Sequence, residues 1–303
     1  MSGRSSILST SHGTNRAAFR FSEWGLLVYL ATLWGGSFLF IAIGLDSLSP
    51  GVVTMGRVSL GALALLVLPS GRQKLNREDW PRVIVLAFTW VAIPFTLFPL
   101  AQQWINSAVA GMLNGGMPIF AALIATALLR ELPGRWQRIG LSVGFVGIIA
   151  ISVPTMGEGS NATIGVALVI VAVALYGLSV NLVTPLQQKY GSVPVMARML
   201  QVAAVLTIPY GVATLPASEF EWGSVMAVVV LGVLGTGLAF AAMAELAGRV
   251  GGTRASVITY LIPVVAIVLG VVFRDDVVTP LALIGIALVI AGAAITSLPE
   301  TRV

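Results

Sequence analysis

The chain has 303 residues, of which 57% are apolar and only 10% are charged, and its mean hydropathy is +0.96. So few charges could not cover the apolar surface of a soluble domain of this size, which indicates that lipid surrounds most of the chain. The lack of cysteine excludes disulfides and thiolate chemistry, and we attribute the net charge of +5 to loops that set membrane orientation rather than to nucleic-acid binding.

Residues 1–22 are polar, small and basic, and they contain no apolar core of signal-peptide length. We expect them to form a disordered cytosolic tail rather than a cleaved signal. Ten apolar runs of roughly 17 to 23 residues follow, each long enough for a helix to cross a bilayer. In chain order, spans 1 to 10 are 24–44, 51–69, 82–101, 107–129, 137–153, 164–184, 194–215, 224–246, 252–273 and 280–297. The sequence therefore predicts an all-α integral membrane protein with ten transmembrane helices.

Lysine and arginine are unevenly divided between the two sides of these spans. The N-terminal tail and every second connecting segment hold 15 of the 17 basic residues. The other segments hold six acidic residues and only Arg274, while Arg57 lies within span 2. Because basic loops remain in the cytosol, we expect both termini there, in a multi-pass protein of the bacterial inner membrane.

The two halves of the chain repeat each other. The stretch "AGMLNGGMPIFAALIATALLRE" aligns with "ASVITYLIPVVAIVLGVVFRDD", which pairs Pro118 with Pro263, and "WGGS" at 34–37 aligns with "YGLS" at 176–179. Each repeat has five spans, an odd number, so the second repeat must enter the membrane upside down. This is the inverted-repeat organisation of secondary transporters, which bind substrate near the midplane. We predict a first repeat at 23–154 and an inverted second repeat at 155–303, around a central cavity.

Pro118 and Pro263 are candidate hinges, because both fall near mid-depth of spans 4 and 9. Each proline leaves a backbone carbonyl four residues earlier, on Asn114 and Thr259, without its helical partner. Such backbone is tolerated at membrane depth only against protein or a water-filled cavity. Two interpretations remain: the prolines bend both spans around a cavity that they help to gate, or they are packing kinks.

Several segments carry a resemblance to a known family: "WGGSF" in span 1, Arg57 in span 2, "PIFAALIATALLRE" followed by "RIGLSVGFVGI", and "YLIPVVAIVLGVVFRDD". From Trp24 to Ser297 the chain resembles the bacterial EamA family of the drug/metabolite transporter superfamily. The resemblance implies a ten-helix, pseudo-two-fold basket with alternating access, moving small metabolites and often exporting amino acids, as YddG-type exporters do. Asp276 departs conservatively from the usual glutamate. The resemblance does not identify the substrate.

Two charged residues near the spans have alternative interpretations. Arg57 either snorkels towards the interface and Asp46, anchors a substrate carboxylate, or braces neighbouring helices. Glu245, at the end of span 8, is expected to pair with Arg249 one turn later. No other acid lies deep in the spans, and span 1 lacks the buried glutamate of the small multidrug relatives. This pattern favours uniport or exchange over obligatory proton antiport.

Neutral polar and aromatic side chains remain near mid-depth, and we predict that they bind the substrate. A ring next to a hydroxyl suits an amphipathic zwitterion or another neutral metabolite. The alternative is that these residues only pack helices together. The predicted substrate-binding residues are Trp34, Ser37, Trp90, Asn114, Tyr176, Ser179, Asn181, Thr236 and Tyr260.

The sequence thus predicts a secondary transporter that moves small amphipathic metabolites, amino acids first among them, out of the cytosol by uniport or exchange. A proton-coupled exporter of drugs or other metabolites is the alternative. An integral-membrane enzyme is less favoured, because it needs a catalytic cluster and the single histidine, His12, lies in the tail. We expect no cofactor, metal, nucleic acid or obligate protein partner, but only a small-molecule substrate and the lipid bilayer.

Overall fold

The computed structural model describes residues 21–129, 134–250 and 258–296, and all regular secondary structure in these ranges is helical. Spans 1 to 5 are α1 (Phe21–Leu45), α2 (Pro50–Val67), α3–η3–α4 (Trp80–Leu86, Ala87–Ala92, Ile93–Ala101), α5–α6 (Ser107–Asn114, Met117–Leu129) and α7 (Arg135–Met156). Spans 6 to 10 are α8 (Ser160–Tyr190), α9 (Ser192–Thr214), α10–η5–α11 (Trp222–Gly232, Val233–Leu238, Ala239–Val250), α13 (Ile258–Arg274) and α14 (Pro280–Thr296). Single turns form η1 (Ser70–Arg72), η2 (Arg77–Asp79) and η4 (Leu215–Ala217).

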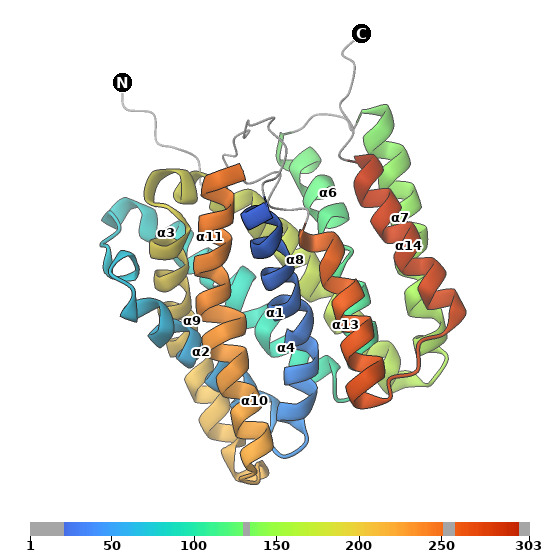
Figure 1. Ribbon diagram of the computed structural model, residues 1–303, viewed down its shortest axis with the longest axis horizontal. Helices are drawn as coiled ribbons and strands as arrows, with labels where there is room; N and C mark the ends of the chain where they lie inside the picture. The colour runs from blue at the N-terminus through green and yellow to red at the C-terminus, as the bar shows by residue number, and fades with distance from the viewer. Residues whose placement is uncertain (1–20, 130–133, 251–257, 297–303) are drawn as a thin grey trace.

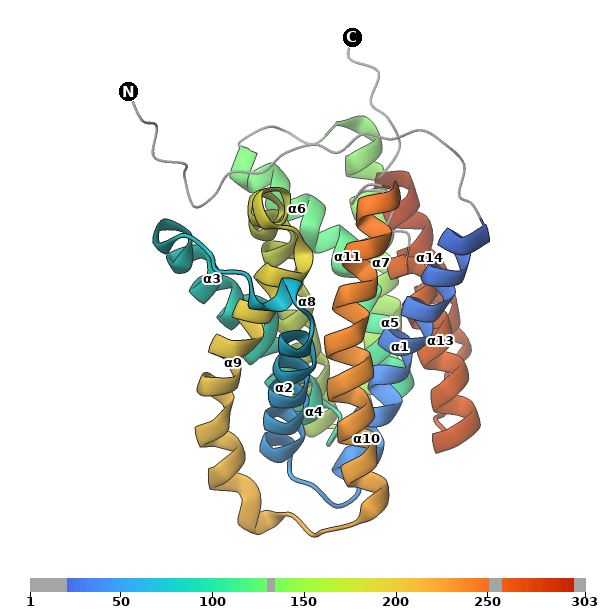
Figure 2. The same ribbon diagram turned by 60° about the vertical axis from the view of Figure 1, so that its left-hand side comes forward.

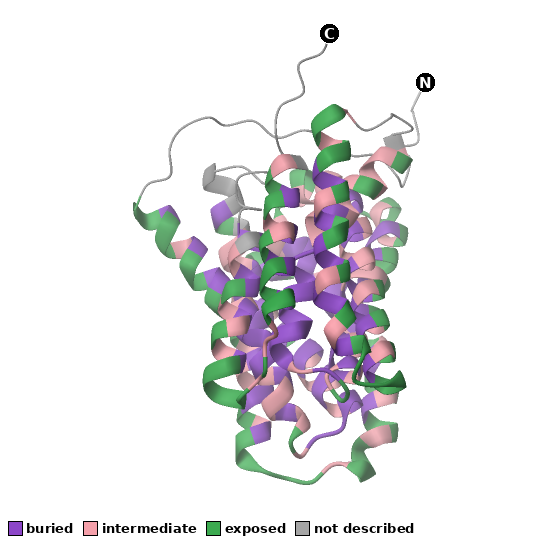
Figure 3. Cartoon of the chain, turned by 90° about the vertical axis from the view of Figure 1, so that its right-hand side faces the viewer, coloured by how far each residue is buried: buried purple, intermediate pink, exposed green. Residues whose placement is uncertain are grey.

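The predicted all-α fold with ten spans is confirmed. Eight described helical segments are long and apolar enough to cross a membrane, and two shorter apolar helices, Leu261–Arg274 and Pro280–Ile295, complete the ten. Large apolar side chains such as Val67, Phe145 and Val205 are exposed on the outside of the bundle. Figure 3 shows exposed residues along the outer faces and buried residues in the interior. A bundle that is apolar on its outer faces as well as in its interior fits a lipid solvent.

Local capping explains where several spans begin. Ser49 precedes Pro50 at the start of α2, and its Oγ accepts a hydrogen bond from Val52 N at 3.5 Å. Asn106 begins α5 in the same way, with Val109 N at 2.8 Å from Oδ1. The Asp276 carboxylate also accepts from Ala108 N at 2.8 Å, which places a negative charge at the start of α5. These oxygens satisfy backbone donors that have no partner inside the helix.

The first described helix begins and the last one ends at the same end of the bundle (Figures 1 and 2). We call this the basic end, since it carries Arg72, Lys74, Arg77, Arg82, Lys189 and Arg198. The opposite, acidic end carries Asp46, Glu158, Glu219, Glu221, Asp275 and Asp276, together with Arg274. The charge asymmetry of the sequence is therefore an asymmetry between the two ends of the bundle.

Helix packing follows a pseudo-two-fold pattern. Equivalent spans of the two repeats pack on each other: α2 on α9, α5 on α13, and α7 on α14. Contacts between non-equivalent spans occur in matched pairs, because α1 packs on α13 as α8 packs on α6, and α1 packs on span 8 (α10 and α11) as α8 packs on span 3 (α3 and α4). Likewise α2 packs on η5 as α9 packs on η3. Exchanging the two repeats reproduces the packing, as two inverted five-helix repeats require.

Glycines bring the equivalent helices α7 and α14 into backbone contact. A Cβ atom on Gly147 would lie 2.6 Å from the Gly285 carbonyl oxygen, and one on Gly292 would lie 2.5 Å from Gly144 N. Gly147 and Gly292 are also aligned in the sequence repeat. Small residues allow such close approach of helices in membranes, so this contact depends on glycine at both positions.

The two candidate hinges have different surroundings. Span 4 is interrupted just before Pro118, where α5 ends at Asn114 and α6 begins at Met117. Gly115 N and Gly116 N donate to the carbonyls three residues earlier, at 3.0 Å each. Span 9, in contrast, is continuous through Pro263. A Cβ on Gly115 would lie 2.7 Å from Pro263 Cγ, so the break in span 4 faces the proline of span 9. The hinge role of Pro118 and Pro263 stays a prediction.

Candidate substrate site between the repeats

A row of aromatic rings crosses the interior between the repeats. The Phe98 ring in span 3 stacks on Tyr176 of span 6, with ring centroids 5.9 Å apart. Its other neighbour is Phe38 of span 1, at 5.5 Å edge to face. Trp34, one turn before Phe38, meets the ring of Phe240 in span 8 at 5.8 Å. Two predicted site residues, Trp34 and Tyr176, therefore lie in aromatic contacts, whereas their phenylalanine partners were not predicted.

Arg57 points into the protein and does not snorkel. Its side chain is only 6% exposed, its Nε donates to Thr236 Oγ1 at 3.1 Å, and its guanidinium carbon lies 3.7 Å from the centroid of the Phe95 ring. Asp46 instead accepts two hydrogen bonds from Arg274, at 2.7 and 2.9 Å. The interpretation of Arg57 as a snorkelling residue that reaches towards Asp46 is therefore wrong. The inward position brings this charge to the contact between α2 and span 8.

A π-helical segment, η5, positions the partner of Arg57. Thr236 is fully buried there, and its Oγ1 donates to the Leu231 carbonyl, five residues earlier, at 3.0 Å. Glycines allow α2 to approach: a Cβ on Gly232 would lie 3.0 Å from the Arg57 carbonyl oxygen, and one on Gly61 would lie 2.7 Å from Thr236 Cγ2. Short π segments occur frequently at functional sites because they redirect side chains within a helix. The sequence prediction included Thr236 but not its π geometry.

A second π segment, η3, lies at the corresponding place in span 3. Thr89 Oγ1 accepts a hydrogen bond from Ser179 at 2.8 Å and donates to the Val85 carbonyl at 3.0 Å. Ser179 is fully buried, so this contact satisfies its hydroxyl. Trp90, the next residue in η3, is partly buried and packs on the apolar core beside spans 2, 3 and 7. The two π segments thus hold the predicted residues Trp90 and Thr236.

The remaining predicted residues have different surroundings. Ser37 donates to the Leu33 carbonyl of its own helix at 2.9 Å. Asn181 donates to the Ala121 carbonyl at 3.0 Å and the Gly177 carbonyl at 2.8 Å, which ties α8 to α6. The side chain of Tyr260 lies outside the described residues. Ser37 and Asn181 therefore have protein partners of their own, and their contact with substrate stays a prediction.

Asn114 differs from these because its side-chain oxygen has no partner. The residue is 8% exposed and ends α5 directly before the break in span 4, and Oδ1 accepts no hydrogen bond from the described residues. A buried polar atom without a partner costs free energy unless water or a ligand reaches it. Asn114 is therefore suited to meet water or a substrate donor.

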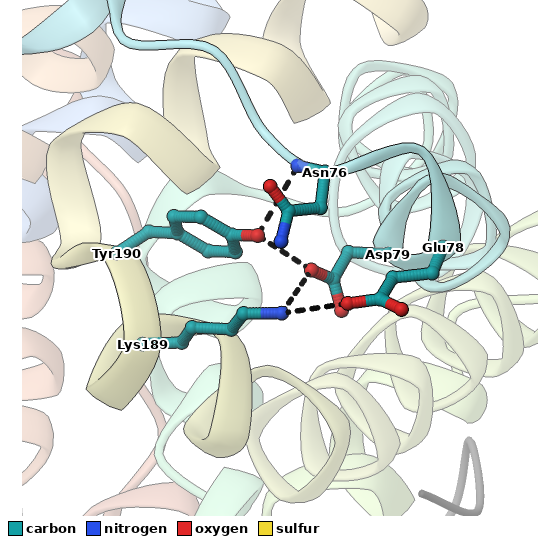
Figure 4. Close-up of polar contacts among 5 residues, drawn as sticks. All are labelled: Asn76, Glu78, Asp79, Lys189 and Tyr190. Carbon is teal, nitrogen blue, oxygen red and sulfur yellow. Dashed lines mark hydrogen bonds and ion pairs between the residues drawn. The ribbon is translucent and has the colours of Figure 1, made fainter. Parts of the chain in front are cut away.

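Polar clusters join the two halves at both ends of the bundle. At the basic end, Lys189 lies 2.8 Å from Asp79 and 3.2 Å from Glu78 (Figure 4). The Tyr190 hydroxyl donates to Asp79 at 2.6 Å and accepts from Asn76 N at 3.1 Å. Burial raises the pKa of Asp79, but the hydrogen bonds from Lys189 and Tyr190 outweigh it and hold this pKa below its ordinary value. The cluster thus connects the start of span 3 to the end of span 6.

The acidic end has its own connections between the halves. Glu219 N donates to the Ser47 carbonyl at 2.7 Å, and Ser49 N donates to Ser218 Oγ at 2.8 Å. The Arg274–Asp46 ion pair joins the end of span 9 to the same 46–49 turn. Glu245, near the basic end, is exposed, and the side chain of Arg249 lies outside the described residues, so their pairing stays a prediction.

Comparison with known proteins gives a consistent result over almost the whole chain. Residues 23–153 and 163–298 each match the EamA-like transporter family. A protein of Streptantibioticus cattleyicolor named as a probable terminal-alkyne amino-acid exporter is 26% identical, over 89% of this chain and 91% of its own length. An uncharacterized transporter of Archaeoglobus fulgidus is 23% identical, over 89% and 96%. One solved crystal structure aligns with a TM-score of 0.63 at 19% identity, over 92% of this chain and 97% of its own, which supports the fold.

Proposed function

The chain belongs to the EamA-like transporter family, and on that premise we propose that it moves amino acids or similar small amphipathic metabolites out of the cytosol by alternating access. One observation carries the choice of substrate: aromatic rings and a buried arginine meet between the two repeats. Rings accommodate an apolar side chain, and the few polar groups among them can fix its orientation. The exporter named for terminal-alkyne amino acids supports the same substrate class.

The positions of the aspartate and glutamate residues favour uniport or exchange as the mode of transport. The described aspartates and glutamates lie in the connecting segments, in the first turn of α1 or towards the end of α11. None of those described lies beside the aromatic row. A carrier without a titratable acid in its site has no direct means to couple each substrate to a proton.

The placement in the membrane follows from the two ends of the bundle. The basic end would face the cytosol of a bacterial inner membrane, and it is the end where α1 begins and α14 ends. Both termini would then be cytosolic. The predicted repeats, 23–154 and 155–303, would each contribute one side of the transport path.

Transport of labelled amino acids into proteoliposomes tests the proposal. We expect counterflow of at least one amino acid with an apolar side chain, at the same rate with and without a pH gradient. Flux that collapses with the gradient would favour the proton-coupled exporter instead. Absence of counterflow for every amino acid, in protein that remains folded in the vesicles, would contradict the substrate class.

A further inference from the structure

We propose that Arg57 is the anchor for the carboxylate of the substrate, and that the transported class is therefore monocarboxylates with an apolar remainder. This inference rests on the proposed function, because it assigns a substrate group to the site between the repeats. The proposal also distinguishes a role of Arg57 in binding substrate from a purely structural role as a brace between helices.

The charge of Arg57 has no counter-charge in the described part of the chain. Its partners there are the Thr236 hydroxyl and the Phe95 ring. Both are neutral. A buried cation is costly in a membrane protein unless an anion or several acceptors meet it, and one hydroxyl with one ring offsets only part of that cost. The site therefore attracts an anion.

The free donors of Arg57 match a carboxylate in number and shape. A guanidinium carries five N–H groups, and only the Nε–H is engaged, by Thr236. The N–H groups of the two terminal nitrogens donate to no described residue. Two parallel N–H groups of this kind bind both oxygens of one carboxylate. Thr236 engages the Nε–H and Phe95 lies against the guanidinium carbon, so this fork stays without a partner among the described residues.

The surroundings of Arg57 suit the apolar remainder of such a substrate. Phe95 lies against Arg57. Phe98, three residues later in α4, stacks on Tyr176 and meets Phe38, so apolar ring faces continue from the cation towards span 1. A substrate with its carboxylate on Arg57 can lay an apolar side chain along this row. The site thus combines one charged contact with an apolar surface, the pattern typical of small-molecule sites.

The repeat supplies only one such anchor. The residue of span 7 that corresponds to Arg57 is Gln201, and its Oε1 accepts a hydrogen bond from Arg198 at 2.7 Å. A second carboxylate or a phosphate would need a further cation between the repeats, and the other buried arginine of the described residues, Arg82, lies at the basic end. This is why we infer monocarboxylates rather than dicarboxylates or phosphate esters.

The test compares an amino acid with its carboxamide, for example leucine with leucinamide, as counterflow substrates in proteoliposomes. We expect the wild-type protein to prefer the acid by roughly 10- to 100-fold, the size of a charged hydrogen-bonded contact. Arg57→Gln should remove most of this preference by slowing transport of the acid, and Arg57→Lys should retain part of it. Arg274→Gln, which removes an arginine that pairs with Asp46 at the acidic end, is the matched control and should keep the preference.

If the role of Arg57 is purely structural, the expected result is different. Arg57→Gln would then slow acid and amide by the same factor, and that outcome, or equal transport of both by the wild type, would overturn the proposal. If Arg57→Gln does not fold, the wild type and Arg57→Lys are compared instead by thermal unfolding in the presence of leucine or leucinamide. Equal stabilisation by the two ligands would overturn the proposal. If no amino acid moves but butyrate stabilises the wild type and not Arg57→Gln, the anchor stands and the proposed function fails.

Discussion

Spans 3 and 8 both change from α-helix to π-helix at corresponding places in their repeats, at Ala87–Ala92 and at Val233–Leu238. In span 3 the π segment presents Thr89 to the hydroxyl of Ser179, a neutral contact. In span 8 it presents Thr236 to the cation of Arg57. The repeat therefore conserves the backbone geometry while the side chains differ, so that a symmetric scaffold holds an asymmetric site.

The neighbours of the two π segments also differ in size. Gly232, directly before η5, allows α2 to approach, whereas the residue directly before η3 is Leu86, which has a fully buried side chain. In span 8 the threonine thereby meets Arg57 of α2, whereas Thr89 of span 3 meets Ser179 of α8. The charged contact therefore depends on a glycine as well as on the threonine.

The largest expected effect comes from closing the space that Gly232 leaves open. In Gly232→Val the new Cβ would lie 2.7 Å from Leu60 Cβ and 3.0 Å from the Arg57 carbonyl oxygen, so α2 and span 8 must separate. Overpacking of this kind costs about 3 kcal/mol of unfolding free energy. We expect unfolding at a lower denaturant concentration in mixed micelles and loss of transport. Gly223→Val, where nothing lies within 4 Å, is the control, and an equal loss there would show that the tight contact is irrelevant.

Removing the two π-segment hydroxyls should give smaller and unequal effects. Thr236→Val leaves a buried cation without its acceptor, at a cost of about 2 kcal/mol, whereas Thr89→Val leaves a neutral hydroxyl unpaired, at about 1 kcal/mol. Both values refer to the unfolding free energy measured as above. Equal losses for the two variants would contradict the asymmetry of the site.

Transport should distinguish the same two variants more clearly than stability does. Thr236→Val should slow counterflow of a carboxylate substrate because the guanidinium loses its orientation. Thr89→Val should change that rate little. A stronger effect of Thr89→Val would place the substrate contact in the first repeat instead.

The smallest effect is expected at the basic end, where Asp79 meets Lys189 and Tyr190. Because folding lowers the pKa of Asp79, its carboxylate stabilises the fold fully above its ordinary pKa of 3.8 and loses this contribution as the pH falls through the folded value. Asp79→Asn should therefore lower the melting temperature slightly at pH 7. The difference from wild type should vanish at a pH well below 3.8. A difference that is independent of pH would show that the charge of Asp79 contributes nothing.

The spans and the repeat could be predicted because they are recorded in composition and spacing. Each span is an apolar run between charged turns, and glycines such as Gly147 and Gly292 recur in register. The π segments could not be predicted, because a shift from i−4 to i−5 hydrogen bonds changes no residue type. The sequence left the direction of Arg57 open among three interpretations, because its acceptor, Thr236, is 179 residues away in the sequence and only the fold brings the two together. The sequence predicted a bend of span 4 at Pro118, whereas the helix is interrupted at Gly115–Gly116, directly before that proline.

The most direct test of a substrate path between the repeats is the reactivity of a single cysteine at Asn114, in a chain that has no other cysteine. Asn114 is buried beside the break in span 4, and its side-chain oxygen, which has no partner among the described residues, indicates a place that water or substrate reaches. Leu123→Cys, 43% exposed on the outside of α6, faces lipid and is the control. We predict that Asn114→Cys reacts with a small membrane-impermeant thiol reagent, that a transported amino acid slows the reaction, and that Leu123→Cys shows neither effect. An Asn114→Cys protein that transports normally and never reacts would contradict the proposed path.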